Sequence, residues 1–390
     1  MSSADQGSVC RACGSGDLHR VLDLGRQPAA DHFPLASSRV TEAESGHPLA
    51  MDLCGTCGLA QLAEDDTVAD EPRGVEPQAL KDQAADAVSR VDAAGLLGGE
   101  ARGGRTVREF PSPHGGTWIP LLAARGYVEV AGPADVVIDS MGIMHEPDQR
   151  SAFAERAAVL ADGGLLLLQY HSLAAILRQG QWNALRHGHF AYYSLHSLLR
   201  LLESAGLRAV QAWEFELYGG SVLVAARHVG SATATAADGG PAVAAHLCGP
   251  GIEDVLAAES AAGVTDPAAL GELGRHARDQ AIALRSWAAA NTAAGYGVYA
   301  YGAASRAVPL FALAGLDRAT LRAVADASPA KLGLRMPGTD IPIVSPEALV
   351  GMRPDRVLLT VPDLYDEVLQ RYPSLEGALT IDPEKGVRHA

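Results

Sequence analysis

Asp135-Val136-Val137-Ile138-Asp139 and Leu165-Leu166-Leu167-Leu168-Gln169 are the two stretches that decide the fold class of this chain. Each is a short apolar run, which is typical of a strand buried on both faces of a sheet. Residues 151–160 between them have helical spacing, and Asp162-Gly163-Gly164 is expected to form the turn before the second strand. A strand, a helix and a strand in this order predict a parallel sheet with helices on its faces, which is an α/β fold.

The same alternation continues in both directions and predicts a doubly wound middle domain over residues 75–229. Helices are expected at 81–97 and 195–205. A hairpin-like pair of strands at 209–217 and 221–226 is expected to close the domain.

A second α/β pattern predicts a smaller, Rossmann-like C-terminal domain over residues 251–390. It begins with a largely helical segment at 253–294. Residues 297–306 then have the pattern of a strand, a glycine turn and the start of a helix, and further strands are expected at 323–326 and 356–360.

Four of the five cysteines form two closely spaced pairs, Cys10-Arg11-Ala12-Cys13 and Cys54-Gly55-Thr56-Cys57. Two such short turns let four thiolates converge on one ion, so we predict a structural Zn²⁺ held by Cys10, Cys13, Cys54 and Cys57. A redox pair and inert thiols are the alternatives. The fifth, Cys248, is expected to be a small buried hydrophobic residue.

The zinc site defines a small N-terminal module over residues 1–66. Strands are expected at 20–24 and 59–62. A module of this size is too small to fold well without its metal, so metal binding and folding should be coupled.

The composition excludes some classes of partner. The 390 residues carry a formal net charge of −15 at pH 7, so the surface is expected to repel nucleic acid and anionic membranes. An anionic substrate would need a local basic pocket. Residues 1–9 contain no apolar run of signal-peptide length and no later stretch approaches a membrane span, so we expect a cytoplasmic protein. Residues 64–74 and 230–250 are predicted to be linkers.

An ordered series of short motifs covers nearly the whole chain. The cysteine pairs come first, with Leu24-Gly25-Arg26-Gln27-Pro28 after the first pair. The later motifs are Met144-His145-Glu146-Pro147-Asp148, Arg186-His187-Gly188-His189-Phe190-Ala191-Tyr192-Tyr193-Ser194, Tyr218-Gly219-Gly220-Ser221, Tyr301-Gly302-Ala303-Ala304-Ser305-Arg306, Asp326-Ala327-Ser328-Pro329-Ala330-Lys331 and Pro337-Gly338-Thr339-Asp340-Ile341-Pro342. This arrangement resembles the C-3 methyltransferases that act on nucleotide-linked keto-deoxysugars in deoxysugar and antibiotic biosynthesis.

The resemblance implies an architecture and a reaction. The architecture is a zinc-binding N-terminal domain, a central domain that binds S-adenosylmethionine (SAM) and a C-terminal domain associated with the nucleotide-sugar. The reaction is SAM-dependent C-methylation of a nucleotide-linked 4-keto-deoxysugar, which begins when a base removes the proton beside the ketone. Other enzymes of the deoxysugar pathway are expected as partners.

The resemblance assigns the catalytic residues by position. His189 matches the catalytic base, His187 its neighbour, and His145 a histidine next to the donor and substrate. Arg186 and Gly188 stand where the family has tyrosine and glutamate, and Arg186 could donate to the enolate oxygen. Residue chemistry alone fits a surface cluster of histidines equally well.

The substrate-binding residues are expected in two places. A glycine turn at a helix start, such as residues 302–306, offers backbone donors and a positive dipole to an anion, and Arg335 could add charge nearby. The resemblance and this turn together give the set Tyr192, Tyr193, Gly219, Gly220, Ser305, Arg306 and Lys331.

The methyl-donor site departs most from the family pattern. Glu109 and Gly115 match the end of the first strand and its glycine-rich turn, and Glu129 is the candidate for the ribose-binding carboxylate. Pro111 and Pro113 stiffen this turn and remove N–H donors. The chain after Gly126 is also shorter than the family pattern. The sequence therefore predicts a shortened SAM domain and weak SAM binding.

Three alternatives follow from that departure. An epimerase or isomerase would keep the base and lose methyl transfer. A 4-ketoreductase would need a nicotinamide site, although the C-terminal turn keeps only Gly302 of the usual glycine pattern. A degenerate family member would bind a pathway enzyme without catalysis.

Overall fold

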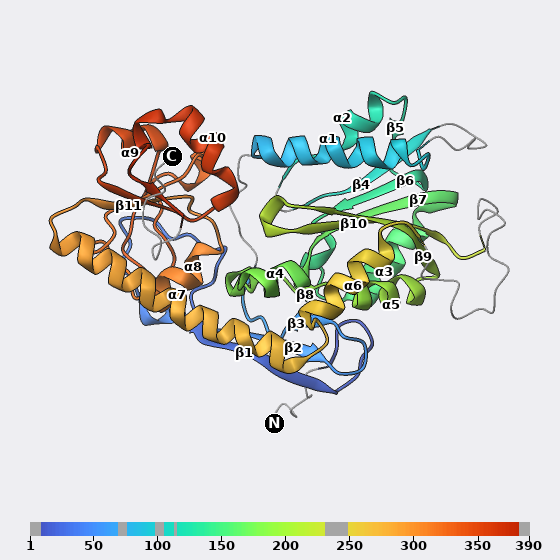
Figure 1. The fold of residues 1–390 in the computed structure, drawn as a ribbon, viewed down its shortest axis with the longest axis horizontal. Coiled ribbons are helices and arrows are strands. Elements are labelled where there is room, and N and C mark those ends of the chain that lie inside the picture. The colour runs from blue at the N-terminus through green and yellow to red at the C-terminus, as the bar shows by residue number, and fades with distance from the viewer. Residues whose placement is uncertain (1–8, 69–75, 98–104, 113–114, 231–248, 382–390) are drawn as a thin grey trace.

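Three sheets organise the chain in the computed structural model, which describes residues 9–68, 76–97, 105–112, 115–230 and 249–381. In Figure 1 the middle domain lies on the right, the C-terminal domain on the left and the N-terminal sheet along the bottom. The predicted mixed α/β architecture is confirmed. The linker predicted at 64–74 is described only to residue 68, and only the two ends of the one at 230–250 are described. Cys248 lies outside the described residues.

The N-terminal sheet is antiparallel and takes one strand from the middle of the chain. Its order is β1 (Leu18–Gln27), β2 (His47–Cys54), β3 (Ala60–Leu62) and β8 (Ala191–Tyr192). The 3-10 turn η1 (Glu42–Ser45) precedes β2. In the last pair, Ala60 lies opposite Tyr192 and Gln61 opposite Ala191. The zinc module is therefore joined by backbone pairing to the segment that carries the histidine motif.

The middle sheet has six strands in the order β5-β4-β6-β7-β10-β9. The strands β4 (Thr106–Phe110), β5 (Val128–Glu129), β6 (Ala134–Ser140) and β7 (Leu160–His171) are parallel. The strands β9 (Leu207–Phe215) and β10 (Ser221–His228) form the expected hairpin. The turn predicted at 162–164 is corrected, because β7 already begins at Leu160. Ala134 pairs with Leu160 and Val136 with Leu165, so the intervening residues form a bulge.

Helices cover both faces of the middle sheet (Figure 1). On one face lie α1 (Gln78–Ala93) and α2 (Ile119–Ala123), and on the other α3 (Gln149–Ala158) and α5 (Leu195–Ser204). Each face has its own apolar core, as a doubly wound sheet requires. The helix α4 (Leu173–Gln179) follows β7 directly. Three 3-10 turns complete this part: η2 (Ile143–His145), η3 (Trp182–Ala184) and η4 (Leu217–Gly219).

The C-terminal sheet is entirely parallel, in the order β13-β12-β11-β14-β15. Its strands are β11 (Val298–Tyr301), β12 (Val324–Ala325), β13 (Ile343–Val344), β14 (Arg356–Leu359) and β15 (Leu379–Thr380). The connections are α8 (Ala307–Ala314), η6 (Pro329–Lys331), α9 (Pro346–Gly351), η7 (Pro362–Leu364), α10 (Tyr365–Arg371) and η8 (Pro373–Leu375). The strand order reverses at β11, which is where sheets of this class bind ligands.

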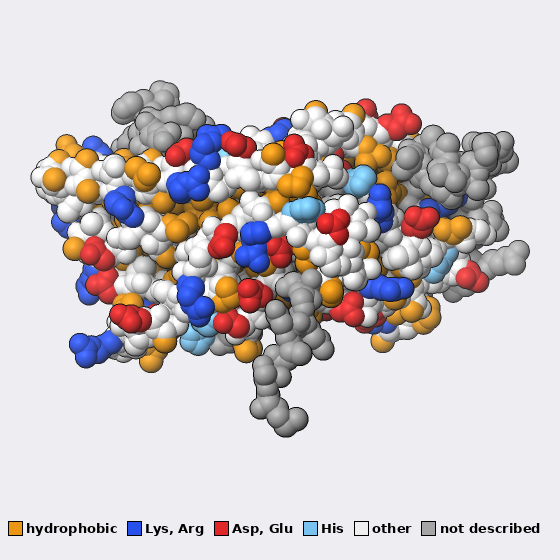
Figure 2. Space-filling model, turned by 90° about the horizontal axis from the view of Figure 1, so that it is seen from below, with side chains coloured by type: hydrophobic (Ala, Val, Ile, Leu, Met, Phe, Trp, Pro, Cys, Tyr) orange, Lys and Arg blue, Asp and Glu red, His pale blue; other side chains and the backbone are white. Residues whose placement is uncertain are grey.

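The helical segment predicted at 253–294 is two helices rather than one. The first, α6 (Ile252–Ala262), packs against α4, α5 and β9 of the middle domain. The second, α7 (Pro267–Ala293), starts with Asp266 as its cap and runs along β1 to α8. It therefore joins all three parts of the chain (Figure 1). Acidic and basic side chains are interspersed over the underside of the molecule (Figure 2). None of the helices in the described part of the chain is both long and apolar enough to cross a membrane.

A buried ion pair fastens the N-terminal module to the C-terminal domain. Arg335 is 1% exposed, and its two terminal nitrogens lie 2.6 and 2.7 Å from the carboxylate oxygens of Glu44. The guanidinium also donates to the carbonyl oxygens of Ser38, Arg39 and Thr339. Arg335 is thus fully used by this contact, which corrects the expectation that it adds charge for a substrate.

Removing one partner of this pair should leave a buried charge without compensation. Glu44→Gln is expected to lower the free energy of unfolding by about 3 kcal/mol at pH 7. Arg335 lowers the pKa of Glu44, so the stabilisation is present above the usual carboxyl range and is lost as the pH falls through the folded-state pKa. The melting temperatures of wild type and Glu44→Gln should therefore differ at pH 7 and become equal as the pH is lowered to 3. Glu42→Gln, on the exposed side of the same turn, is the control. If both variants have the same melting temperature as wild type at pH 7, the ion pair does not stabilise the fold.

Candidate functional site

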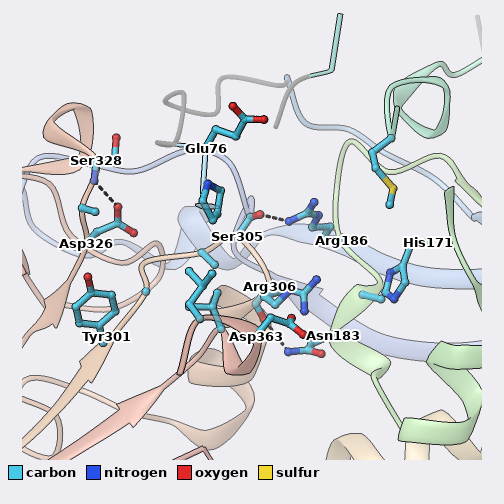
Figure 3. A pocket seen from close by; sticks show the side chains of 18 of the residues that line it. Glu76, His171, Asn183, Arg186, Tyr301, Ser305, Arg306, Asp326, Ser328 and Asp363 are labelled. Atoms are coloured by element: carbon cyan, nitrogen blue, oxygen red, sulfur yellow. Dashed lines mark hydrogen bonds between the residues drawn. The ribbon is translucent and has the colours of Figure 1, made fainter. Parts of the chain in front are cut away.

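A cavity of about 270 Å³ lies where the middle and C-terminal domains meet. The carboxyl ends of β6 and β7 reach it from one side, and those of β11, β12 and β14 from the other, so both parallel sheets present their ligand-binding edges to it. Figure 3 labels ten of the polar residues that line it: Glu76, His171, Asn183, Arg186, Tyr301, Ser305, Arg306, Asp326, Ser328 and Asp363. His189 and Lys331 line the cavity as well.

The C-terminal wall of the cavity is the turn between β11 and α8. Gly302 has φ +99°, and a Cβ there would lie 2.6 Å from Oγ1 of Thr360, so only glycine fits. Asp326 holds the turn by accepting hydrogen bonds from the backbone N–H groups of Ala303 and Ser328, both at 2.8 Å. Nζ of Lys331 donates to the carbonyl oxygen of Ala303 at 2.9 Å. These contacts place Ser305, Arg306 and Lys331 on one side of the cavity.

The histidine motif is held by the N-terminal module rather than by a helix. The N–H of Gly188 donates to Asp65 at 2.8 Å, and Nε2 of His187 contacts the carbonyl oxygen of Pro48 at 3.1 Å. Phe190 donates its N–H to the carbonyl oxygen of Met144 at 2.8 Å. The next residues form β8, which pairs with β3. The position of His189 therefore depends on the folding of the zinc module.

His189 lines the cavity and is bound at Nε2 by Arg186. The guanidinium Nε lies 2.8 Å from Nε2 of His189, and Nη2 lies 2.5 Å from the same atom. Nη1 of Arg186 donates to the hydroxyl of Ser305 in the C-terminal turn (Figure 3). Because a guanidinium only donates hydrogen bonds, Nε2 of His189 must be the unprotonated acceptor in this arrangement. The ring is then a neutral imidazole, the form that acts as a base.

Two other histidines of the predicted site lie beside the cavity rather than on its wall. His145 packs edge-on behind His189, with ring centroids 4.2 Å apart. Burial and the nearby Arg186 lower the pKa of His145 to about 3, so it is neutral at pH 7. His187 faces the zinc module, 5.9 Å from the ring of His47. Burial lowers the pKa of His187 as well.

The remaining predicted substrate contacts separate into two groups. Tyr192 lines the cavity, and its hydroxyl accepts a hydrogen bond from the N–H of Arg186 at 3.1 Å. Tyr193 instead lies in the core of the middle domain, where its hydroxyl donates to Gln149. Gly219 and Gly220 pack closely against α4 and do not line the cavity. Core packing explains Tyr193, whereas the half-buried Gly219 and Gly220 line other hollows beside α4.

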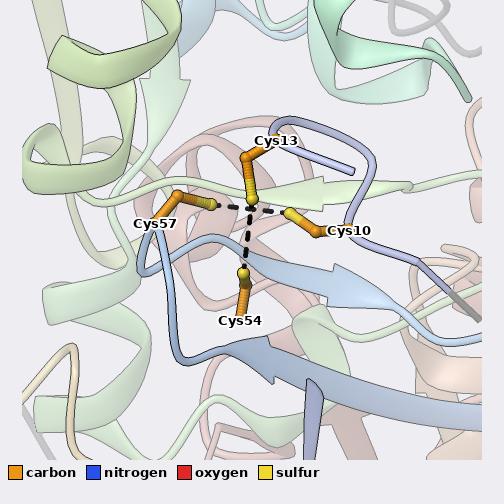
Figure 4. Close-up of side chains that lie close together, drawn as sticks. All are labelled: Cys10, Cys13, Cys54 and Cys57. Atoms are coloured by element: carbon orange, nitrogen blue, oxygen red, sulfur yellow. Dashed lines mark hydrogen bonds between the residues drawn. The ribbon is translucent and has the colours of Figure 1, made fainter. Parts of the chain in front are cut away.

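The four paired cysteines form a compact cluster, with their sulfurs directed at one another (Figure 4). The Sγ atoms of Cys10 and Cys57 are 3.5 Å apart, those of Cys13 and Cys54 are 3.7 Å apart, and all four lie within 4.8 Å of one another. A tetrahedron with Zn–S bonds of 2.3 Å has edges of about 3.8 Å. A hydrogen bond with Cys57 lowers the pKa of Cys10 to about 5 and raises that of Cys57. The donor set fits Zn²⁺, whose charge would favour the thiolate form of all four.

Two family models match this chain. Residues 216–378 match the model described as "C-methyltransferase C-terminal domain", and residues 10–69 match the one described as "Putative zinc binding domain". The chain is also similar to the C-methyltransferase NovU of Streptomyces niveus, with 27% identity over 401 residues that cover 92% of this chain and 91% of the relative. Over its zinc-binding and C-terminal parts, and over most of its length in this relative, the chain is similar to C-methyltransferases.

Solved methyltransferase structures resemble a part of this chain. The magnesium protoporphyrin IX methyltransferase of Synechocystis with bound S-adenosylhomocysteine matches with a TM-score of 0.28 and 14% identity, over 40% of this chain and 90% of that chain. The N-methyltransferase NodS of Bradyrhizobium japonicum, also with S-adenosylhomocysteine, matches with a TM-score of 0.27 and 13% identity, over 39% and 89% of the two chains.

The region expected to hold the methyl donor is closed over the described residues of this chain. Glu109 lies one residue before the end of β4, and its carboxylate accepts hydrogen bonds from the hydroxyl of Thr117 and from the N–H of Trp118. Gly116 has φ +85°, and a Cβ there would lie 2.2 Å from the carboxylate of Glu76. The hollow bounded by these residues and by Gly115 is about 20 Å³. That volume holds about one water molecule, so the described residues of this turn leave no room for SAM in this conformation.

Two further features of the donor region concern Glu129, whose role stays a prediction, and the segment after Gly126. Glu129 lies on the exposed edge strand β5, beside β4. The segment after Gly126 reaches β6 after that one short strand. Pro113 lies outside the described residues. Burial raises the pKa of Glu109, as expected for a carboxylate enclosed by its own loop.

Sequence reasoning missed several residues of the cavity wall. His171 ends β7 and points into the cavity (Figure 3). A rule that places ligands at the carboxyl ends of parallel strands could have found both His171 and Asp326. Asn183, whose amide donates to the carbonyl oxygen of Arg306 at 3.3 Å, and Asp363 lie on 3-10 turns without a sequence signal.

Proposed function

We propose that this protein acts on a nucleotide-linked 4-keto-deoxysugar, and that His189 removes the proton from the carbon beside the ketone. One observation carries the proposal: the imidazole of His189 and the turn at residues 302–306 line the same cavity, and Arg186 contacts both. A base and an anion-binding turn at one site match a substrate with a diphosphate and an acidic C–H bond. The similarity to a C-methyltransferase supports carbon as the reacting atom.

The charge of the cavity suits such an anionic substrate. The whole chain carries −15, but the cavity wall has four basic side chains (Arg186, Arg306, Lys331 and Arg371) against four acidic ones (Glu76, Asp326, Asp363 and Glu367). The basic residues Arg306 and Lys331 lie with Ser305 at the start of α8, where the helix dipole also favours an anion. The diphosphate would therefore bind on the C-terminal wall and the sugar would extend towards His189.

The first chemical step uses only residues of this cavity. His189 accepts the proton, the electrons of the C–H bond form the carbon–carbon double bond of an enolate, and the carbonyl oxygen takes the negative charge. His189 then carries a positive charge, and the basic side chains stabilise the enolate oxygen. His145 stays neutral beside it, so it adds no second positive charge against the newly formed imidazolium.

The enolate has two candidate fates. The similarity to C-methyltransferases favours methylation at carbon, with SAM supplying the methyl group when it is bound. The closed donor region favours the second candidate, in which a proton returns to the enolate and the product is an epimer or isomer. Two alternatives do not involve an enolate: reduction of the ketone, and binding without catalysis. The experiment below distinguishes them from the proposal.

The proposal is tested by incubating the protein with a nucleotide-linked 4-keto-6-deoxysugar in D₂O. Deuterium is expected to appear at the carbon beside the ketone, as read by NMR and mass spectrometry. Addition of SAM distinguishes the fates: a gain of one methyl group shows methylation, and an inverted centre without that gain shows epimerisation. Reduction of the ketone only with an added nicotinamide cofactor, or no exchange at all, would refute the proposal.

The donor region makes a prediction about affinity. S-adenosylhomocysteine is expected to bind with a dissociation constant of about 1 mM or weaker, which is roughly −4 kcal/mol. Glu76→Ala should tighten binding about tenfold, because it removes the side chain that lies on Gly116. Calorimetric titration measures both, and Glu64→Ala, an exposed glutamate of the N-terminal module, is the control. A micromolar constant for wild type would overturn this prediction and favour methylation.

A further inference from the structure

Arg186 occupies Nε2 of His189, which is the acceptor in this contact because a guanidinium only donates hydrogen bonds. Two of its N–H groups converge on Nε2, at 2.8 and 2.5 Å. Both side chains are buried, at 9% and 8% exposure. While this contact holds, Nε2 cannot accept a proton from a substrate, because its lone pair is already directed at the guanidinium.

The same guanidinium already touches the opposite wall of the cavity. Its Nη1 donates to the hydroxyl of Ser305, which is 1% exposed and lies two residues before α8. Arg306 and Lys331 line the cavity beside this turn. The N–H of Arg186 donates to the hydroxyl of Tyr192 at 3.1 Å, and this contact holds the backbone from which the side chain extends.

A diphosphate on the C-terminal wall would compete with His189 for this guanidinium. Arginine binds phosphate through parallel hydrogen bonds in which donor and acceptor are both ionised, whereas in its contact with His189 only the donor is ionised. The neutral imidazole of His189 is therefore the weaker of the two partners. A tyrosine at this position could not change partner in this way, since it has one hydroxyl and no charge.

We propose that Arg186 is a positioning residue that covers Nε2 of His189 until the diphosphate of the substrate, bound at the Ser305 turn, draws the guanidinium off that nitrogen. This inference rests on the proposed function, since it takes His189 as the base. Binding of the nucleotide part then uncovers the base, so proton removal is restricted to sugars that carry the diphosphate. Selectivity arises in the proton-transfer step as well as in binding.

The first experiment needs no turnover. Inorganic pyrophosphate is added to the full-length protein, its binding is measured by calorimetry, and the carbethoxylation rate of His189 by diethylpyrocarbonate is followed by peptide mass spectrometry. In wild type the rate is expected to rise about tenfold on pyrophosphate binding. In Arg186→Gln it should be high with and without pyrophosphate. Arg125→Gln, which alters a surface ion pair with Asp92, should behave as wild type.

The second experiment separates positioning from a structural role. Arg186→Gln should slow deuterium exchange into the nucleotide-linked ketosugar, yet raise exchange into the free 4-keto-6-deoxysugar above the wild-type rate. Arg186→Lys should restore part of the discrimination, because its charge still favours the diphosphate. A merely structural residue would lower both rates together.

The outcomes distinguish this inference from the proposed function. If pyrophosphate binds but the reactivity of His189 stays constant or falls, Arg186 does not cover the base and the inference is wrong. If wild type exchanges no deuterium even with the nucleotide-linked ketosugar, the proposed function fails first. If Arg186→Gln slows both sugars equally, Arg186 acts only through stability or binding.

Discussion

His189→Ala is expected to slow deuterium exchange into the carbon beside the ketone by about 10² to 10⁴, the usual contribution of a general base. The physical reason is that a ketone α-proton is weakly acidic, and His189 is the histidine that both lines the cavity and is held as a neutral acceptor by Arg186. The measurement is the initial rate of deuterium uptake at pH 7.5, at saturating nucleotide-linked ketosugar. Methylation and epimerisation share this step, so the result does not depend on the fate of the enolate.

His187→Ala is the matched control for this prediction. Its ring faces Pro48 and the N-terminal module rather than the cavity, so exchange should fall much less. Thermal melting of both variants shows whether the fold is retained. If exchange in His189→Ala equals that of wild type, the base lies elsewhere, and His145, 4.2 Å behind His189, becomes the candidate.

Loss of the metal should have the second large effect. Protein purified without added metal is expected to contain about one equivalent of zinc, and Cys54→Ser should lose it and unfold the N-terminal module. Binding of a structural Zn²⁺ contributes about 10 to 16 kcal/mol in small zinc modules, so the loss is far larger than the module can compensate. Metal analysis and thiol titration provide the measurement.

Unfolding of the N-terminal module should also displace the residues of the histidine motif that line the cavity. The strand β3 pairs with β8, and Asp65 holds the N–H of Gly188, so the histidine motif loses its support when the module unfolds. Deuterium exchange is therefore expected to disappear in Cys54→Ser although the cysteine is no part of the cavity wall. Cys248→Ser is the control and should keep both zinc and exchange. Full exchange in a zinc-free Cys54→Ser protein would show that the module does not position His189.

The sequence by itself determined those features that depend on short-range patterns. Each cysteine pair closes within four residues, so its spacing alone brings two thiolates to one point. The apolar runs at β6, β7 and β11 predict parallel strands because burial on both faces requires them to be apolar throughout. The turn at residues 302–306 and the histidine motif were recognised in the same way, from adjacent residues.

Only the tertiary structure decided which of these local features meet and which side chains face the cavity. Arg186 and Ser305 are 119 residues apart in sequence, and β8, with only two residues, has too little alternation to predict its partner β3. His187 and Tyr193 belong to the same motif as His189 but point into the zinc module and the core. The fixation of Arg335 by Glu44 spans 291 residues. Side-chain direction and long-range pairing depend on how whole elements pack, and no short stretch of sequence carries that information.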